Sequence, residues 1–204
     1  SDWMEVYKTL VRWELELEDV ATDMKEMLAM QKREANVEFC KFVRKNYMSW
    51  MDTLVQHQLD NNRPLMSPEI FKNQVFPLLA KGEKVFFLLI DNLRWDHWKT
   101  LLPELSEDFN IEETMYCSIL PTATQYARNA IFSGLMPIEI ETMFPQLWVD
   151  EESEEGKNLN EEELIATQIA RYRRKDRFSY GKVLTSAAAE RKYTGMNSTG
   201  SHEM

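Results

Sequence analysis

Two short stretches of the sequence carry side chains that could form a phosphoryl-transfer site. The first is the apolar run from Lys84 to Ile90, which ends at the carboxylate of Asp91. The second is Pro121-Thr122-Ala123-Thr124, which places two hydroxyls at the head of a helical pattern. A carboxylate at a strand end suits zinc, magnesium or manganese. A threonine hydroxyl needs a base or a metal to become a nucleophile. The two stretches therefore predict Asp91 and Thr124 as partners, with Thr124 as the attacking group.

Each of these side chains also has a purely structural interpretation. Thr122 and Gln125 match a capping box, which would leave Thr124 as an ordinary residue of the first helical turn. Asp91 could equally cap a helix that begins near Arg94. Because helix caps are far commoner than nucleophiles, the local pattern favours the structural interpretation of the threonines.

Two further polar residues follow the proposed nucleophile. Arg128 and Asn129 fall within a turn and a half of Thr124 on the predicted helix. Both could contact a phosphate oxygen, and a guanidinium binds phosphate with two parallel hydrogen bonds. Arg128 could just as well be a surface charge.

A β-α-β unit is predicted to hold these residues. The run at 84–90 is typical of a strand buried on both faces. A helix is expected around Arg94 to Leu102, followed by an alternating stretch at Ile111 to Ile119. Such crossovers make the two strands parallel, and ligands bind at their carboxyl ends. We therefore expect Asp91 and Thr124 at the same sheet edge.

The first third of the chain is predicted to be an all-helical bundle over residues 1–66. Apolar residues recur at alternating steps of three and four, as in a heptad seam. The polar stretch from Gln31 to Asn36 is the expected reversal of an antiparallel hairpin. His57 continues the second seam and is interpreted as a bundle residue. The two seams are Trp3, Val6, Leu10, Trp13, Leu17, Val20, Met24 and Met27, then Cys40, Val43, Tyr47, Trp50 and Leu54.

The remaining segments show clear local signals. Ser67-Pro68-Glu69 predicts the start of a helix that runs to about Ala80. The acidic run at 150–155 predicts an exposed loop, and Glu161 to Glu163 open a helix whose basic end suits the helix dipole. Phe178 to Leu184 is a possible strand. Residues 187–204 are expected to be a disordered or foreign tail.

Composition limits the classes of function. The chain has 204 residues, 44% of them hydrophobic, and a formal net charge of -10. That charge argues against duplex-DNA binding, which needs a broad basic face. Only Cys40 and Cys117 are present, so no disulfide framework or zinc-thiolate cluster is implied. No signal peptide or run of roughly 18 apolar residues is seen, so we expect a cytoplasmic protein without a membrane partner.

The motifs taken together resemble the alkaline phosphatase superfamily. A strand ending in Asp-Asn is followed by Pro-Thr-x-Thr and then by Ser133-Gly-Leu-Met-Pro137. The wording of residues 88–96 and 119–135 is still closer to the PglZ domain, and the bundle is similar to that of PorX-like response regulators of type IX secretion. The resemblance implies an α/β fold with an N-terminal all-α bundle, in which residues 67–186 hold the first β-α-β part of the phosphatase-like parallel sheet.

The resemblance also implies a mechanism. Asp91 would hold one of two zinc ions, and Thr124 would bridge to it and attack a phosphodiester of a nucleotide or oligonucleotide. Water would then release the phosphorylated threonine. Arg128 and Asn129 would contact the substrate.

The sequence departs from the superfamily in its later ligands. The expected Asp-x-x-x-His, Asp-His-Gly and His segments are missing, and His202 is the sole histidine after Thr124. A receiver domain before the bundle is missing as well. We therefore expect a truncated piece or a shortened relative that binds metal weakly and is inactive by itself. The alternative is a non-catalytic interaction module that docks a sigma factor, a sensor kinase or a second copy of the chain.

Overall fold

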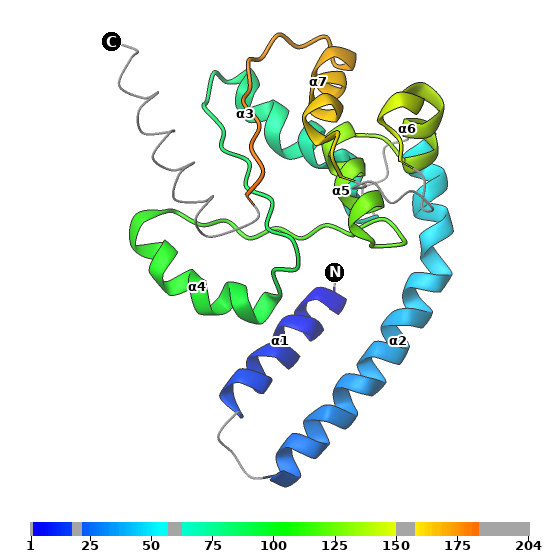
Figure 1. The fold of residues 1–204 in the computed structure, drawn as a ribbon. Coiled ribbons are helices and arrows are strands. Elements are labelled where there is room, and N and C mark those ends of the chain that lie inside the picture. Colours follow the sequence, from blue (N-terminus) through cyan, green and yellow to red (C-terminus); the bar gives the residue numbers. More distant parts are fainter. Residues whose placement is uncertain (1, 18–21, 57–62, 150–157, 184–204) are drawn as a thin grey trace.

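The computed structural model describes residues 2–17, 22–56, 63–149 and 158–183, and Figure 1 shows their arrangement. Two helices, α1 (Asp2–Glu16) and α2 (Thr22–Val55), lie side by side as a hairpin. The short helices that follow gather near the far end of α2. The described part of the chain is helical, and it contains no strand longer than an isolated bridge.

The hairpin of α1 and α2 confirms the predicted bundle, but the predicted position of its turn is wrong. The chain reverses between Glu16 and Thr22, whereas the polar stretch from Gln31 to Asn36 lies inside α2. The ring of Trp3 packs against Phe39 at a centroid distance of 5.8 Å. Lys, Arg, Gln and Glu are good helix formers, so a polar stretch without Gly or Pro does not end a helix.

A nearly continuous helical run follows the bundle, as predicted for residues 67–80. It consists of the 3-10 turn Ser67–Glu69, the π-helical turn Phe71–Val75 and α3 (Phe76–Ala80). With α5, α6, α7 and the 3-10 turn Pro145–Leu147, it surrounds the main apolar core. The helices are α5 (Thr124–Ser133), α6 (Pro137–Met143) and α7 (Glu161–Arg171), and the core is Phe71, Val75, Phe76, Ile131, Phe132, Leu135, Ile140, Leu164 and Ile165.

Helix α4 (Trp95–Asp108) follows the apolar run, in the place where a crossover helix was expected. It lies against α1, where the ammonium of Lys8 sits 5.5 Å from the ring centroid of Trp95. Its side chains also bind the segment after it, because Lys99 forms an ion pair with Glu113 at 2.9 Å. The predicted order of extended segment, helix and extended segment is therefore present.

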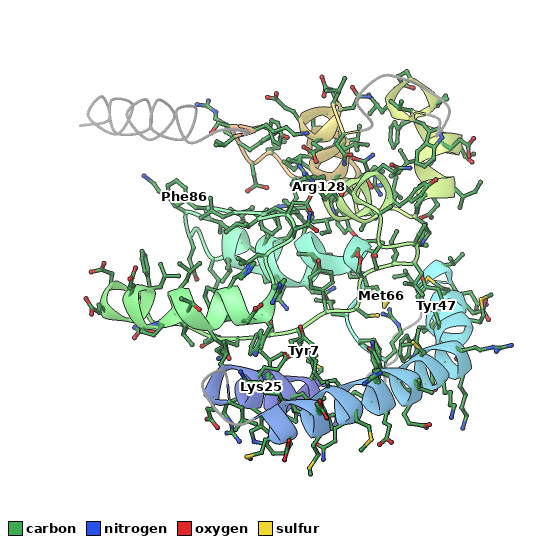
Figure 2. The ribbon with its side chains drawn as sticks, turned by 60° about the horizontal axis from the view of Figure 1, so that its bottom comes forward. Tyr7, Lys25, Tyr47, Met66, Phe86 and Arg128 are labelled. Atoms are coloured by element: carbon green, nitrogen blue, oxygen red, sulfur yellow. The ribbon has the colours of Figure 1, made fainter. Side chains whose placement is uncertain are left out.

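The predicted parallel sheet is absent from the described residues. The run at 84–90 is extended, but only one of its faces is partly buried, through Val85 and Leu89. Phe87 packs on Phe71 with 4.8 Å between ring centroids, while Phe86 and Leu88 are 80% and 84% exposed. Figure 2 shows Phe86 at the outside of this segment. The expectation of a strand buried on both faces is thus wrong for this structure.

The second extended segment, after α4, forms one isolated parallel bridge between Met66 and Cys117. There the backbone amide of Cys117 donates to the carbonyl of Leu65 at 2.7 Å. A sheet needs a ladder of such bonds between strands about 4.8 Å apart. Here the extended segments bury their side chains against helices and do not pair with each other, so apolar patterning produced extended backbone without a sheet. The predicted strand at 178–184 is likewise unpaired over its described residues.

A second, smaller core joins the bundle to the rest of the molecule. The residues of α2 that contribute to it, Met51 and Leu54, pack with Met66 and with Ala127 of α5. Figure 2 shows Tyr47 and Met66 near each other at this end of α2. The hairpin is therefore packed directly onto the helix that begins at Thr124.

Several predictions fall on residues outside the described ranges, namely His57, the acidic run at 150–155, Leu184 and the tail at 187–204. Cys40 and Cys117 are both free thiols. Among the helices that the structure describes, none has the length and apolar character needed to cross a bilayer.

Candidate functional site

The side chains of Asp91 and Thr124 meet in the structure. The hydroxyl of Thr124 donates a hydrogen bond to Oδ2 of Asp91 across 3.4 Å. Asp91 comes directly after the extended run, where Asn92 turns the chain with a φ of 58°. Asparagine adopts this left-handed conformation more readily than most residues. The two predicted residues thus come together even though the sheet that was expected to align them is not formed.

The hydroxyl of Thr124 is not used as a helix cap. Helix α5 begins at Thr124 itself, and its cap position is held by Ala123, which has no polar side chain. The predicted capping box of Thr122 and Gln125 is therefore wrong. As a result, the side chain of Thr124 is available for the contact with Asp91.

Arg128 lies one turn further along α5 and reaches the same carboxylate. Its Nη1 is 3.4 Å from Oδ2 of Asp91, the oxygen that also accepts from Thr124. Its Nη2 is 2.5 Å from Oε1 of Glu161 at the start of α7. The guanidinium therefore bridges a half-exposed carboxylate and a fully buried one.

Asn129 lies elsewhere. It is buried, and its side-chain oxygen is 3.5 Å from Nδ2 of Asn158. The same Asn158 nitrogen donates to the backbone carbonyl of Thr124 at 3.1 Å. The structure thus connects Asn129, through Asn158, to the backbone of Thr124, whereas Arg128 contacts Asp91.

By sequence, Glu161 is predicted only as one of three acids that open a helix. Its side chain is fully buried, and it faces Arg128, the ammonium of Lys182 at 3.4 Å and the hydroxyl of Tyr180, which donates to it. Burial raises the pKa of Tyr180, and the hydrogen bond to the Glu161 carboxylate raises it further. No local pattern distinguishes Glu161 from Glu162 or Glu163, so only packing reveals this cluster.

The charges of the four ionisable side chains of the site balance. Asp91 and Glu161 are negative, and Arg128 and Lys182 are positive, all linked by the contacts above. A chain with a net charge of -10 repels anions at long range. A locally neutral site adds no repulsion of its own where a phosphate would bind.

The described residues fit one end of a metal site but not a paired zinc centre. The carboxylate of Asp91 and the hydroxyl of Thr124 are oxygen donors on one side of a cation position, as a hard or borderline metal requires. Within the described ranges, no group of three or more His, Cys, Asp or Glu side chains could hold an ion.

Comparison with known families shows which family the chain belongs to. Residues 70–196, more than half of its length, match the family described as the BREX system PglZ alkaline phosphatase-like domain. The chain belongs to the PglZ alkaline phosphatase-like family. Residues 1–51 match the PorX response regulator linker domain. No curated protein matches the chain.

The two family matches divide the site and its support between them. Asp91, Thr124, Arg128 and Glu161 all fall within the PglZ match. Tyr47 of α2 falls within the linker match and contacts the loop that precedes Thr124. The PglZ domain therefore holds the candidate site, and the PorX linker holds one of its supporting residues.

Proposed function

We propose that this chain is the linker and PglZ effector region of a PorX-like response regulator of type IX secretion, and that its effector hydrolyses phosphodiesters of nucleotides or oligonucleotides. The observation that carries this proposal is the convergence of the Thr124 hydroxyl and the Arg128 guanidinium on one oxygen of Asp91. A nucleophile, a proton acceptor and a phosphate-binding cation are thereby grouped around one point.

The chemistry follows from those three groups. Oγ1 of Thr124 attacks phosphorus, a bond forms between them, and the bond from phosphorus to the departing alcohol breaks. Oδ2 of Asp91 already accepts a hydrogen bond from this hydroxyl and is placed to take its proton during attack. Arg128 would hold a non-bridging phosphate oxygen. Water then displaces Thr124 from phosphorus and returns its hydroxyl.

Zinc is the cofactor that the resemblance implies, and Asp91 and Thr124 are the residues that would hold it. When bound, it would favour the ionised threonine and offset the charge on phosphate. We expect the chain by itself to bind zinc weakly and to turn over little or no substrate, because the described residues do not complete a zinc site.

The test uses the full-length protein with zinc supplied and bis(p-nitrophenyl) phosphate as the probe. Thr124→Val removes the hydroxyl and keeps the shape, so hydrolysis should fall by about 10³-fold or more. Thr122→Val is the matched control, because Thr122 is exposed and precedes the helix. Hydrolysis by Thr124→Val at the parent rate would show that this threonine is not the nucleophile.

A groove in the hairpin favours a second candidate function, the docking of a sigma factor, a sensor kinase or a second copy of the chain. It has a volume of about 1080 Å³ and lies between α1, α2 and residues 115–117. Trp3, Tyr7, Phe39, Phe42 and Trp50 supply most of its aromatic lining. Aromatic side chains dominate the energetics of many protein interfaces.

Two variants separate the candidates. Phe39→Asp should abolish binding to a purified partner in titration or self-association in sedimentation equilibrium, and should leave hydrolysis unchanged. Thr124→Val should do the opposite. A Phe39→Asp variant that binds the sigma factor and the sensor kinase and self-associates as the parent does would exclude the docking function.

A further inference from the structure

The feature that the proposed function leaves unexplained is the buried cluster around Glu161. Glu161 is the first residue of α7, and its side chain is 0% exposed. A buried charge is costly unless it is paired. Here Arg128, Lys182 and Tyr180 surround it. This cluster adjoins the candidate site through Arg128, which contacts both Glu161 and Asp91.

Arg128 lies closer to its buried partner than to its exposed one. The ion pair to Glu161 measures 2.5 Å, whereas the contact to Asp91 measures 3.4 Å. The Asp91 side chain is 41% exposed, so water screens its attraction to Arg128 more than that of Glu161. The guanidinium is rigid and planar, so fixing its Nη2 edge also fixes the direction of its Nη1 edge.

Glu161 is itself well anchored. Leu164 and Ile165, one turn further along α7, are part of the main core. The ammonium of Lys182 lies 3.4 Å from Oε2, so the carboxylate keeps a charged partner besides Arg128. The carboxylate therefore stays in place when the exposed part of the site changes.

We propose that Glu161 is a positioning residue, which fixes Arg128 so that its outer edge, beside Asp91 and Thr124, takes a non-bridging oxygen of a phosphoryl group. This inference rests on the proposed function and deepens it. The ligand class is a phosphate ester, and inorganic phosphate shares the chemistry that Arg128 would recognise.

The kinetic test is a double-mutant cycle in the full-length protein with zinc and bis(p-nitrophenyl) phosphate. Arg128→Met should lower kcat/KM by about 10²-fold or more, and Glu161→Gln should lower it by about 10-fold or more. The double variant should be no worse than Arg128→Met alone, because Glu161 acts through Arg128. Fully multiplicative losses would overturn the inference.

Tyr180→Phe is the matched control. It removes another partner of Glu161 and leaves the pair with Arg128, so kcat/KM should stay within about threefold of the parent. A purely structural role of the cluster predicts equal losses for Tyr180→Phe and Glu161→Gln, and that result would also overturn the inference.

A second readout needs no activity and uses this chain directly. Arginine side-chain ¹⁵N relaxation should show a rigid Arg128 Nε in the parent and in Tyr180→Phe, and a mobile one in Glu161→Gln. An equally rigid Arg128 in Glu161→Gln would contradict the inference.

If Glu161→Gln does not fold, Arg128→Lys replaces it, since lysine cannot reach both carboxylates and should be as inactive as Arg128→Met. Parent activity in Arg128→Lys would count against bridging.

The failures of the two proposals are distinguishable. Activity in Thr124→Val would reject the proposed nucleophile. Loss in Thr124→Val together with parent activity in Arg128→Met would keep the nucleophile and reject the role of Arg128, and the inference with it. Loss in Arg128→Met with no loss in Glu161→Gln would reject the positioning role alone.

Discussion

The hydroxyl of Tyr47, on α2, accepts a hydrogen bond from the backbone amide of Leu120 across 2.7 Å. Leu120 lies just before the Pro-Thr-x-Thr stretch that ends at Thr124. The neighbouring amide of Ile119 donates to the hydroxyl of Ser67 at 3.2 Å. The loop that leads to the candidate nucleophile is therefore held by the linker helix and the turn after it, where a sheet neighbour had been expected.

Tyr47→Phe tests this support. It removes the acceptor for the Leu120 amide, so we expect a loss of about 0.5–1.5 kcal/mol in the free energy of unfolding. Urea denaturation measures this loss. Tyr7→Phe on the neighbouring helix α1 is the control, because its side chain is 47% exposed and it should change stability by less than about 0.5 kcal/mol. Equal effects of the two variants would contradict the proposed support.

The ion pair of Arg63 and Glu69 predicts a loss of stability in acid. Both guanidinium terminal nitrogens lie 2.7 Å from the carboxylate oxygens, and the amide of Met66 donates to the same carboxylate at 3.0 Å. Burial alone would raise the pKa of Glu69, but these hydrogen bonds outweigh it, so the pKa lies below the ordinary value of 4.5. The native state thus binds this proton less readily than the unfolded chain.

The sign of the pH dependence follows. The contribution of Glu69 is complete above about pH 4.5 and is lost as the pH falls through the lower pKa of the folded state. Unfolding free energies measured between about pH 3 and 7 should fall less steeply in Glu69→Gln than in the parent. Glu107→Gln, an exposed change on α4, should keep the parent's slope. A parent-like slope in Glu69→Gln would refute the assignment.

Substitution of Gly134 is expected to lower the free energy of unfolding. It ends α5 with a φ of 64°, and an added Cβ would lie 2.9 Å from Cδ of Gln168 and overlap the amide nitrogen of that side chain. Gly134→Ala should therefore cost about 2–4 kcal/mol, from backbone strain and overlap together. Gly82→Ala is the matched control, because Gly82 has a φ of 81° and no atom within 4 Å of the added carbon. Thermal denaturation should show the smaller loss, about 1 kcal/mol, for Gly82→Ala.

The extended run should be sensitive on one face only. Phe87 contacts Phe71 and Phe132, with ring centroids 4.8 Å and 6.2 Å away. Phe87 is itself 38% exposed, so Phe87→Ala should lower the free energy of unfolding by about 1–2 kcal/mol. Phe86→Ala, at a position 80% exposed, should change it by less than about 0.5 kcal/mol. Equal losses at the two positions would mean that both faces are buried.

Much of the local structure was predictable. Heptad spacing predicted a helical hairpin, although its first seam continues past the end of α1 into α2, and the acids at Glu161 to Glu163 marked the start of α7. The turn of the hairpin was misplaced, because Gln31 to Asn36 are polar but compatible with a helix. The sheet was over-predicted, because a continuous apolar run and an alternating stretch indicate which side chains are buried but do not require a paired neighbour. Helix propensity depends on a few neighbouring residues, so the helices could be predicted from the sequence, whereas strand pairing could not.

The candidate site, too, was predictable only in part from the sequence. The sequence by itself determined the chemical types of Asp91 and Thr124, their places at the end of an apolar run and the start of a helix, and their kinship with phosphatases. Only the tertiary structure decided that Arg128 bridges Asp91 to Glu161 and that Tyr47 holds Leu120. These contacts join residues far apart in the chain, and they depend on how α2, α5 and α7 pack. Side-chain periodicity specifies which face of a helix is buried, but the shape of the filled core specifies which distant residue that face meets.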